Sequence, residues 1–180
     1  KKPYLLGLTL AVAALLLHAC GGGGGSPAPG AGQSADAALA SAIRGDTRLA
    51  TVRAKAKQLA SGPLTAGSIY PAVFIRDLNT FIDLAIETHG AQEVRAQLEL
   101  FLVHQGADGS VPDAIVVQDG SWFKGTAETD QESSLVQAIG KYVAASGATA
   151  FLSQDVAGLP VIARLENALL FVYNHRFSAT

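Results

Sequence analysis

Apolar residues recur at helical spacing in one segment of the chain after another, and this repetition constrains the fold more than any other feature. Residues three and four apart share one face of an α-helix, so each segment predicts a helix with one buried stripe. The segments are separated by turn residues, and strand patterns are almost absent. One short β-branched run, Ala114 to Gln118, could form a small hairpin. A succession of such helices predicts an all-α fold of helical hairpins.

The boundaries of these helices follow from the turn signals between them. The predicted helices cover residues 36–60 with an interruption at Gly45-Asp46, then 77–89, 91–105, 130–146 and 159–174. The side chains expected to be buried are Leu78, Phe81, Ile82, Ala85, Val94, Leu98, Phe101, Leu102, Leu135, Val136, Ile139 and Val143.

Arg76 and Asp77 stand where an apolar, aromatic approach from Ile69 gives way to the second helix. Pro71 keeps the residue before it extended. Asp77 suits a helix start because its carboxylate faces the unpaired N–H groups and the positive end of the helix dipole. Two interpretations stay open. The pair is a helix cap beside a surface arginine, or it is presented into a pocket from a loop-to-helix junction.

The longer connections precede Arg76 and Asp130, each at the start of a helix. Antiparallel helices alternate in direction, so the second and fourth helices can bring these starts to the same end of a bundle. Thr129 and Glu132 have the spacing of a capping box, in which Thr129 caps the helix and Glu132 reaches back. We therefore expect a polar pocket at this end, with helix capping as the alternative for Asp130 and Glu132.

The composition fits one globular domain or part of a larger one, with 180 residues, 49% of them hydrophobic and 16% charged, and a net charge of -2. There is no basic run and the pI is about 6.1, which argues against a nucleic-acid partner. Gly21 to Gly25 lacks the Lys-Ser/Thr of a phosphate-binding loop. His89, His104 and His175 are scattered. We therefore expect no cofactor and no metal site.

The first twenty residues have the pattern of an export signal. A lysine pair precedes an almost wholly apolar run from Leu5 to Leu17, which is shorter than the roughly 20 residues that a transmembrane helix needs. The run ends Leu17-His18-Ala19-Cys20, which resembles the lipobox of bacterial lipoproteins, although position 18 is usually small or polar. This resemblance implies cleavage before Cys20 and lipid on its thiol and new amino group. The alternative is an ordinary signal peptide with a buried or free thiol.

These features predict three parts of the chain. Residues 1–19 form the signal peptide, residues 20–34 carry the lipid and a Gly- and Pro-rich flexible tether, and residues 35–180 form the folded part. The protein is then exported and held in the cell envelope by lipid on Cys20, on the periplasmic or the cell-surface side, so the membrane is one expected partner.

Four motifs of the folded part belong together. They are the aromatic approach to Arg76-Asp77, the loop 105–113, the segment 122–136 ending Thr-Asp-Gln-Glu-Ser-Ser-Leu-Val, and Ser146-Gly147 followed by Phe151-Leu152. Together they resemble the six-hairpin glycosidases, the (α/α)6-barrel group that includes glucoamylases, trehalases and debranching enzymes. Ala148 departs from the pattern, because Asp is usual there. The resemblance implies that residues 35–180 are the N-terminal part of an (α/α)6 barrel, incomplete at its C-terminus.

The resemblance also implies roles for individual residues. Arg76 and Asp77 would hydrogen-bond sugar hydroxyls in the innermost subsite, and a guanidinium beside a carboxylate can bind vicinal hydroxyls in bidentate fashion. Asp130 and Glu132 would line the same pocket.

Aromatic side chains would complete that pocket. Trp122 or Phe123 would stack on a sugar ring. For Trp122 the alternative is a half-buried anchor of its loop.

Glycoside hydrolysis needs two carboxyl groups, about 6.5–9.5 Å apart for the inverting reaction. In the resembled enzymes the general acid and base come from later hairpins, so catalytic residues are expected beyond Thr180 and the chain alone is expected to be inactive. The resemblance thus implies a bacterial lipoprotein that hydrolyses carbohydrates. The alternative is a non-catalytic, lipid-anchored helical protein that binds a glycan or a protein partner.

Overall fold

The computed structural model describes residues 31–67, 69–125 and 130–176. The expected signal peptide, Cys20 and the tether up to Gly30 lie outside the described residues, as does Thr129. The described chain is mostly helical, as the apolar periodicity predicts, and none of its helices is both long and apolar enough to cross a membrane. The chain divides into two units, residues 1–49 and 50–180.

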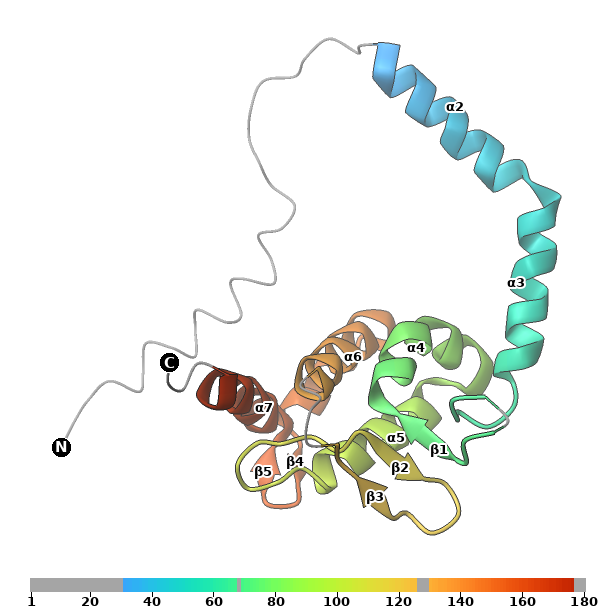
Figure 1. The fold of residues 1–180 in the computed structure, drawn as a ribbon. Coiled ribbons are helices and arrows are strands. Elements are labelled where there is room, and N and C mark those ends of the chain that lie inside the picture. The colour runs from blue at the N-terminus through green and yellow to red at the C-terminus, as the bar shows by residue number, and fades with distance from the viewer. Residues whose placement is uncertain (1–30, 68, 126–129, 177–180) are drawn as a thin grey trace. The chain divides into compact units, whose positions relative to one another are not determined.

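The described part of the first unit consists of helix α2 (Ala31–Gly45) and the beginning of helix α3 (Thr47–Ala60) (Figure 1). α2 begins earlier than the predicted start at Asp36. The predicted break is confirmed, because Asp46 separates the two helices. Its Oδ1 accepts a hydrogen bond from the backbone N–H of Arg48 at 2.9 Å, which satisfies one of the free donors at the start of α3.

In the second unit, four helices surround the core: α4 (Ile75–His89), α5 (Ala91–Val103), α6 (Gln131–Ser146) and α7 (Val161–Arg176) (Figure 1). A 3-10 helix, η1 (Thr149–Ser153), follows α6. The predicted stripes are confirmed as buried at Leu78, Ile82, Ala85, Val94, Leu98, Phe101, Leu102, Leu135 and Ile139. Phe81, Val136 and Val143 are partly buried and pack against this core. Phe81 also interrupts α4, because its φ of -109° and ψ of 16° are not helical.

The predicted hairpin is present, and a third strand joins it. Strands β1 (Ala72–Phe74), β2 (Ala114–Val116) and β3 (Trp122–Phe123) form an antiparallel sheet in that order. The sequence predicts extended backbone only before Pro71, so strand β1 and its pairing with β2 were missed. A second hairpin, β4 (Asp155–Val156) with β5 (Leu159–Pro160), occupies the residues just before α7, which therefore begins later than predicted.

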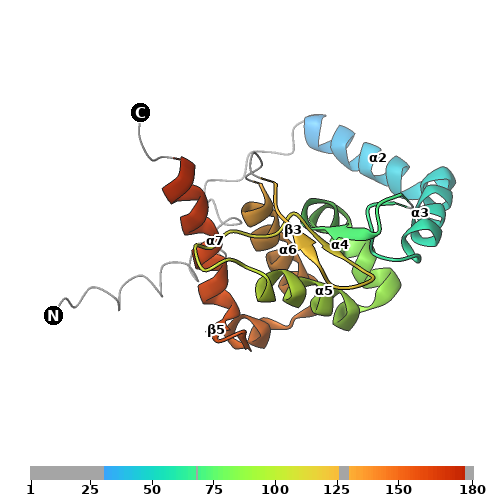
Figure 2. The ribbon, with the colours of Figure 1, turned by 60° about the horizontal axis from the view of Figure 1, so that its bottom comes forward.

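Helices α4 and α6 lie side by side and run in the same direction. Their first turns meet at Arg76 and Asp130, and further along Asn79 Nδ2 donates to Gln137 Oε1 at 3.2 Å. α5 follows α4 through a turn at Gly90, whose φ of +84° suits glycine. From this turn α5 runs back towards the end of the unit at which α4 begins (Figure 2). The prediction that the starts of the second and fourth predicted helices share one end is confirmed.

Candidate functional site

The candidate site lies where the first turns of α4 and α6 meet. Arg76 Nη1 lies 3.7 Å from Asp130 Oδ2, and the two side chains are 42% and 56% exposed. An exposed ion pair of this kind contributes about 0–1 kcal/mol to stability, so the fold does not depend on it. Both groups are accessible to a ligand from solvent.

Asp77 lies in the first turn of α4 and is exposed. The helix begins two residues earlier than predicted, with Phe74 at the N-cap position and no side-chain capping hydrogen bond. Asp77 therefore does not cap the helix through a hydrogen bond. Its carboxylate stays in the favourable field of the helix N-terminus and borders the Arg76–Asp130 pair in sequence.

Glu132 lies beneath this surface instead of on it. Its side chain is 0% exposed, and its Oε1 accepts hydrogen bonds from the Val111 backbone N–H at 2.9 Å and from Lys124 Nζ at 2.8 Å. The capping box predicted for Thr129 and Glu132 includes a residue outside the described ranges; in the described chain α6 has Asp130 at its N-cap, without a side-chain capping bond. Oε2 is buried and has no hydrogen-bond partner in the described chain. In this conformation Glu132 ties the start of α6 to the neighbouring loops and is not exposed on the surface.

Lys124 and Asp113 are functional candidates that the sequence did not suggest. Lys124 Nζ also donates to the Val111 carbonyl at 2.9 Å, so it ties two loops to the start of α6. Asp113 is 5% exposed, its Oδ2 accepts from the backbone N–H of Gly125, and its own N–H donates to Phe123 O at 2.9 Å. A charged residue directly after the aromatic pair was the only local signal for Lys124.

One face of the sheet carries aromatic rings close to the point where β1 ends and α4 begins. Phe74 and Phe123 both pair with Ala114, so they share one face, and their ring centroids lie 5.6 Å apart. The ring of Tyr70 lies 6.0 Å from that of Phe74. Tyr70 and Phe123 are 58% and 45% exposed. We call Tyr70, Phe74 and Phe123 the aromatic strip.

Trp122 lies on the opposite face of the same sheet. It pairs with Ile115, which pairs with Val73, and both of these residues are buried in the core. The indole is 50% exposed and its centroid lies 6.1 Å from that of His104. Of the two aromatic residues named from the sequence, Phe123 is therefore the one that shares a face with the approach to Arg76.

Two tight turns in the loops around the sheet hold charged carboxylates. The hydroxyl and the backbone N–H of Ser110 hydrogen-bond the carboxylate of Asp108, which lowers the pKa of Asp108 below its ordinary value. Ser121 lowers the pKa of Asp119 in the same way. Both carboxylates therefore act as fixed turn-forming acceptors.

No group of three or more His, Cys, Asp or Glu side chains within the described ranges is arranged to hold a metal ion. No protein-family model matches the chain, and no similar protein was found by comparison with curated proteins or with solved structures.

Proposed function

We propose that this protein is a bacterial lipoprotein glycoside hydrolase and that the described residues supply part of its sugar-binding pocket. The observation that carries the proposal is the meeting of two helix starts, which brings Arg76 and Asp130 together at the end of the aromatic strip. A sugar presents vicinal hydroxyls on its rim and C–H groups on its faces. A fixed guanidinium with carboxylates matches the hydroxyls, and an aromatic ring matches the faces.

The helix arrangement supports an (α/α)6 barrel as the complete fold. In such a barrel, parallel inner helices alternate with outer helices that return in the opposite direction. α4 and α6 are neighbours with the same direction, and α5 connects back between them in sequence. In this proposal, α4 and α6 are inner helices whose N-terminal ends face the sugar.

The catalytic pair is proposed to come from later hairpins, beyond Thr180. Arg76, Asp77 and Asp130 would then bind and orient the sugar in the innermost subsite. Glu132 would hold the pocket floor through Lys124. The 180-residue chain would bind sugar weakly and would not hydrolyse it, because hydrolysis needs an acid and a second carboxylate placed on opposite sides of the glycosidic bond.

The lipobox-like end of the apolar run supports anchoring through Cys20. One acyl chain gives only marginal membrane binding, whereas two or more give stable anchoring, so a lipidated Cys20 would hold the enzyme at the envelope on its Gly- and Pro-rich tether. Mass spectrometry of the membrane fraction tests this directly, because lipidation adds acyl mass to a peptide that begins at Cys20, and Cys20→Ser removes it.

Expression of the complete reading frame tests the enzymatic proposal. Hydrolysis of a panel of α- and β-glycosides is compared between the wild type and the double variant Arg76→Ala/Asp77→Ala. We expect at least a hundredfold loss of kcat/KM, because each charge-assisted hydrogen bond contributes about 1.5–3 kcal/mol. Asp83→Ala is the matched control: Asp83 is exposed on the same helix, away from its start, and its loss should leave activity unchanged.

Either of two results would reject the proposal. A folded complete protein that hydrolyses no glycoside would leave a non-catalytic, lipid-anchored binding protein as the better account. An active enzyme that is insensitive to the double variant would place the sugar elsewhere on the molecule.

A further inference from the structure

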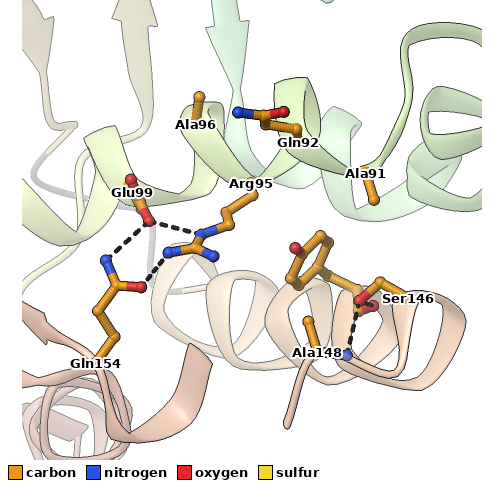
Figure 3. Close-up of a pocket in the computed structure, with 9 residues that line it drawn as sticks. Ala91, Gln92, Arg95, Ala96, Glu99, Ser146, Ala148 and Gln154 are labelled. Atoms are coloured by element: carbon orange, nitrogen blue, oxygen red, sulfur yellow. Dashed lines mark hydrogen bonds and ion pairs between the residues drawn. The ribbon is translucent and has the colours of Figure 1, made fainter. Parts of the chain in front are cut away.

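A cavity of about 590 Å³ lies at the opposite end of the helices from Arg76 and Asp130 (Figure 3). Residues of α5 between Ala91 and Glu99 form one side. The last turn of α6, the residues just after it and Gln154 form the other side. This volume is within the range of small-molecule sites, and the cavity is separate from the proposed sugar pocket.

Arg95 is held in a fixed position inside this cavity. Its Nε donates to Glu99 Oε1 at 2.8 Å, its Nη2 donates to Gln154 Oε1, and its guanidinium lies 4.8 Å from the centroid of the Phe151 ring. These contacts use one edge and one face of the guanidinium. Nη1 makes no hydrogen bond within the described chain, and Figure 3 shows it on the side that faces Ser146 and Ala148. A preorganised charged donor is therefore directed into the cavity.

Tyr142 supplies a second donor. It lines the cavity although the residue is only 3% exposed, and its ring packs edge-on against Phe151 at 5.6 Å. Its hydroxyl makes no hydrogen bond to the described residues, and solvent reaches the oxygen through the cavity. The phenol is held by its ring, so the hydroxyl is available to a ligand.

The start of α5 adds further donors to the same space. Ala91 and Gln92 line the cavity, and the Gly90 cap makes no side-chain hydrogen bond to the first turn. The free backbone N–H groups of a helix start favour negative charge. Donors from Arg95, Tyr142 and the helix start thus line the same cavity, beside the carboxylate of Glu99.

The charge of the cavity limits what these donors can bind. Glu99 neutralises Arg95, and Glu93 in the first turn of α5 offsets the positive end of the helix dipole, so the cavity has no net positive charge. A doubly charged phosphate would be opposed by Glu93 and Glu99, whereas a single carboxylate carries less charge and can accept from both side-chain donors. We propose that this cavity binds a small ligand through a carboxylate group, with Arg95 and Tyr142 as its hydrogen-bond donors. This inference does not depend on the proposed glycosidase activity.

Titration of the ¹⁵N-labelled 180-residue chain with sodium benzoate, followed by NMR, tests the proposal. Benzoate should shift the Arg95 Nε–Hε resonance and the amides of Ala91 and Gln92 in a saturable way. Benzamide has the same shape without the charge and should bind at least tenfold more weakly. Inorganic phosphate should also bind more weakly than benzoate.

Two variants distinguish the proposed donors from the fold. Tyr142→Phe keeps the ring against Phe151 and should lower the affinity for benzoate about tenfold, because one hydrogen bond to a charged group is lost. Arg95→Gln should abolish saturable binding. Arg48→Gln, which removes an exposed arginine of the first unit, should leave the affinity unchanged.

The inference is overturned if benzoate causes no saturable shift at these resonances, or if benzamide or phosphate binds as tightly as benzoate. It is also overturned if Tyr142→Phe keeps its thermal midpoint and binds benzoate with wild-type affinity. If Tyr142→Phe has a lower thermal midpoint than the wild type, Arg95→Gln is used in its place. Wild-type benzoate affinity in Arg95→Gln would also overturn the inference.

Discussion

Replacing Lys124 by Met tests whether the buried Glu132 is stabilised by this one cation. Lys124 Nζ lies 2.8 Å from Glu132 Oε1 and 2.9 Å from Val111 O, while the Glu132 side chain is 0% exposed. Methionine keeps much of the apolar stem but has no ammonium group. The variant therefore leaves a buried carboxylate without its counter-ion and a buried carbonyl without one donor.

The expected loss of unfolding free energy is about 3–4 kcal/mol. Removing one partner of a buried ion pair costs about 3–5 kcal/mol. The Lys124 side chain is 20% exposed, so water reaches one edge of the pair and the lower end of that range applies. The hydrogen bond to the Val111 carbonyl adds about 1 kcal/mol.

Urea unfolding measures this loss, followed by circular dichroism and by the fluorescence of Trp122, the single tryptophan of the chain. The double variant Lys124→Met/Glu132→Gln should recover at least half of the loss, because the amide oxygen still accepts the Val111 N–H and carries no charge. Lys55→Met, at an exposed position, should stay within about 0.5 kcal/mol of wild type.

A Lys124→Met variant within about 0.5 kcal/mol of wild type would refute the reasoning, since the size of the change is derived from the burial of Glu132. So would a double variant no more stable than the single one. That second result would mean that the lost stability comes from packing of the lysine stem and not from the stranded charge.

Two further predictions concern the loop between α5 and β2. Gly109 has a φ of +94°, and a Cβ added there would clash with the backbone carbonyl of Asn167 on α7. Gly109→Ala should therefore lower the thermal midpoint much more than Gly120→Ala. Gly120 has a similar positive φ of +69°, but a Cβ added there would have no atom within 4 Å. The expected difference in unfolding free energy between the two variants, about 1–3 kcal/mol, is therefore due to the steric contact at Gly109. Equal midpoints would contradict this reason. The second prediction concerns stability in acid. Hydrogen bonds from Ser110 lower the pKa of Asp108 in the folded protein below 3.8. The stability that the Asp108 carboxylate contributes is therefore complete above pH 3.8 and is lost as the pH falls through the folded pKa. Asp108→Asn should therefore reduce the urea midpoint at pH 6 and flatten its fall towards pH 3, and parallel pH profiles would argue against this role.

Helix positions and buried stripes could be predicted from the sequence because they depend on local spacing. Residues such as Leu78, Leu98 and Ile139 are buried as expected, since a helix places positions three and four apart on one face whatever it packs against. Alternation of helix direction likewise placed the starts at Arg76 and Asp130 at one end. Boundaries were less accurate: α4 begins at Ile75, because β1 runs directly into it.

The pairings that shape the candidate site could not be predicted, because each joins residues distant in the sequence. Glu132 had the spacing of a capping residue, but its oxygen binds Val111 and Lys124 in loops that only the fold brings to it. The register of the sheet put Phe123 and Trp122 on opposite faces, which depends on a partner strand and not on local pattern.

The amino-acid sequence by itself determined that this chain forms helical hairpins with a charged junction at the start of α4. Tertiary structure alone decided which charges are buried, which aromatic rings lie together, and that a donor-lined cavity opens at the opposite end around Arg95. The physical reason is that helical periodicity is a property of neighbours along the chain. Burial, register and ion pairing instead depend on contacts between segments, whose geometry no local pattern specifies.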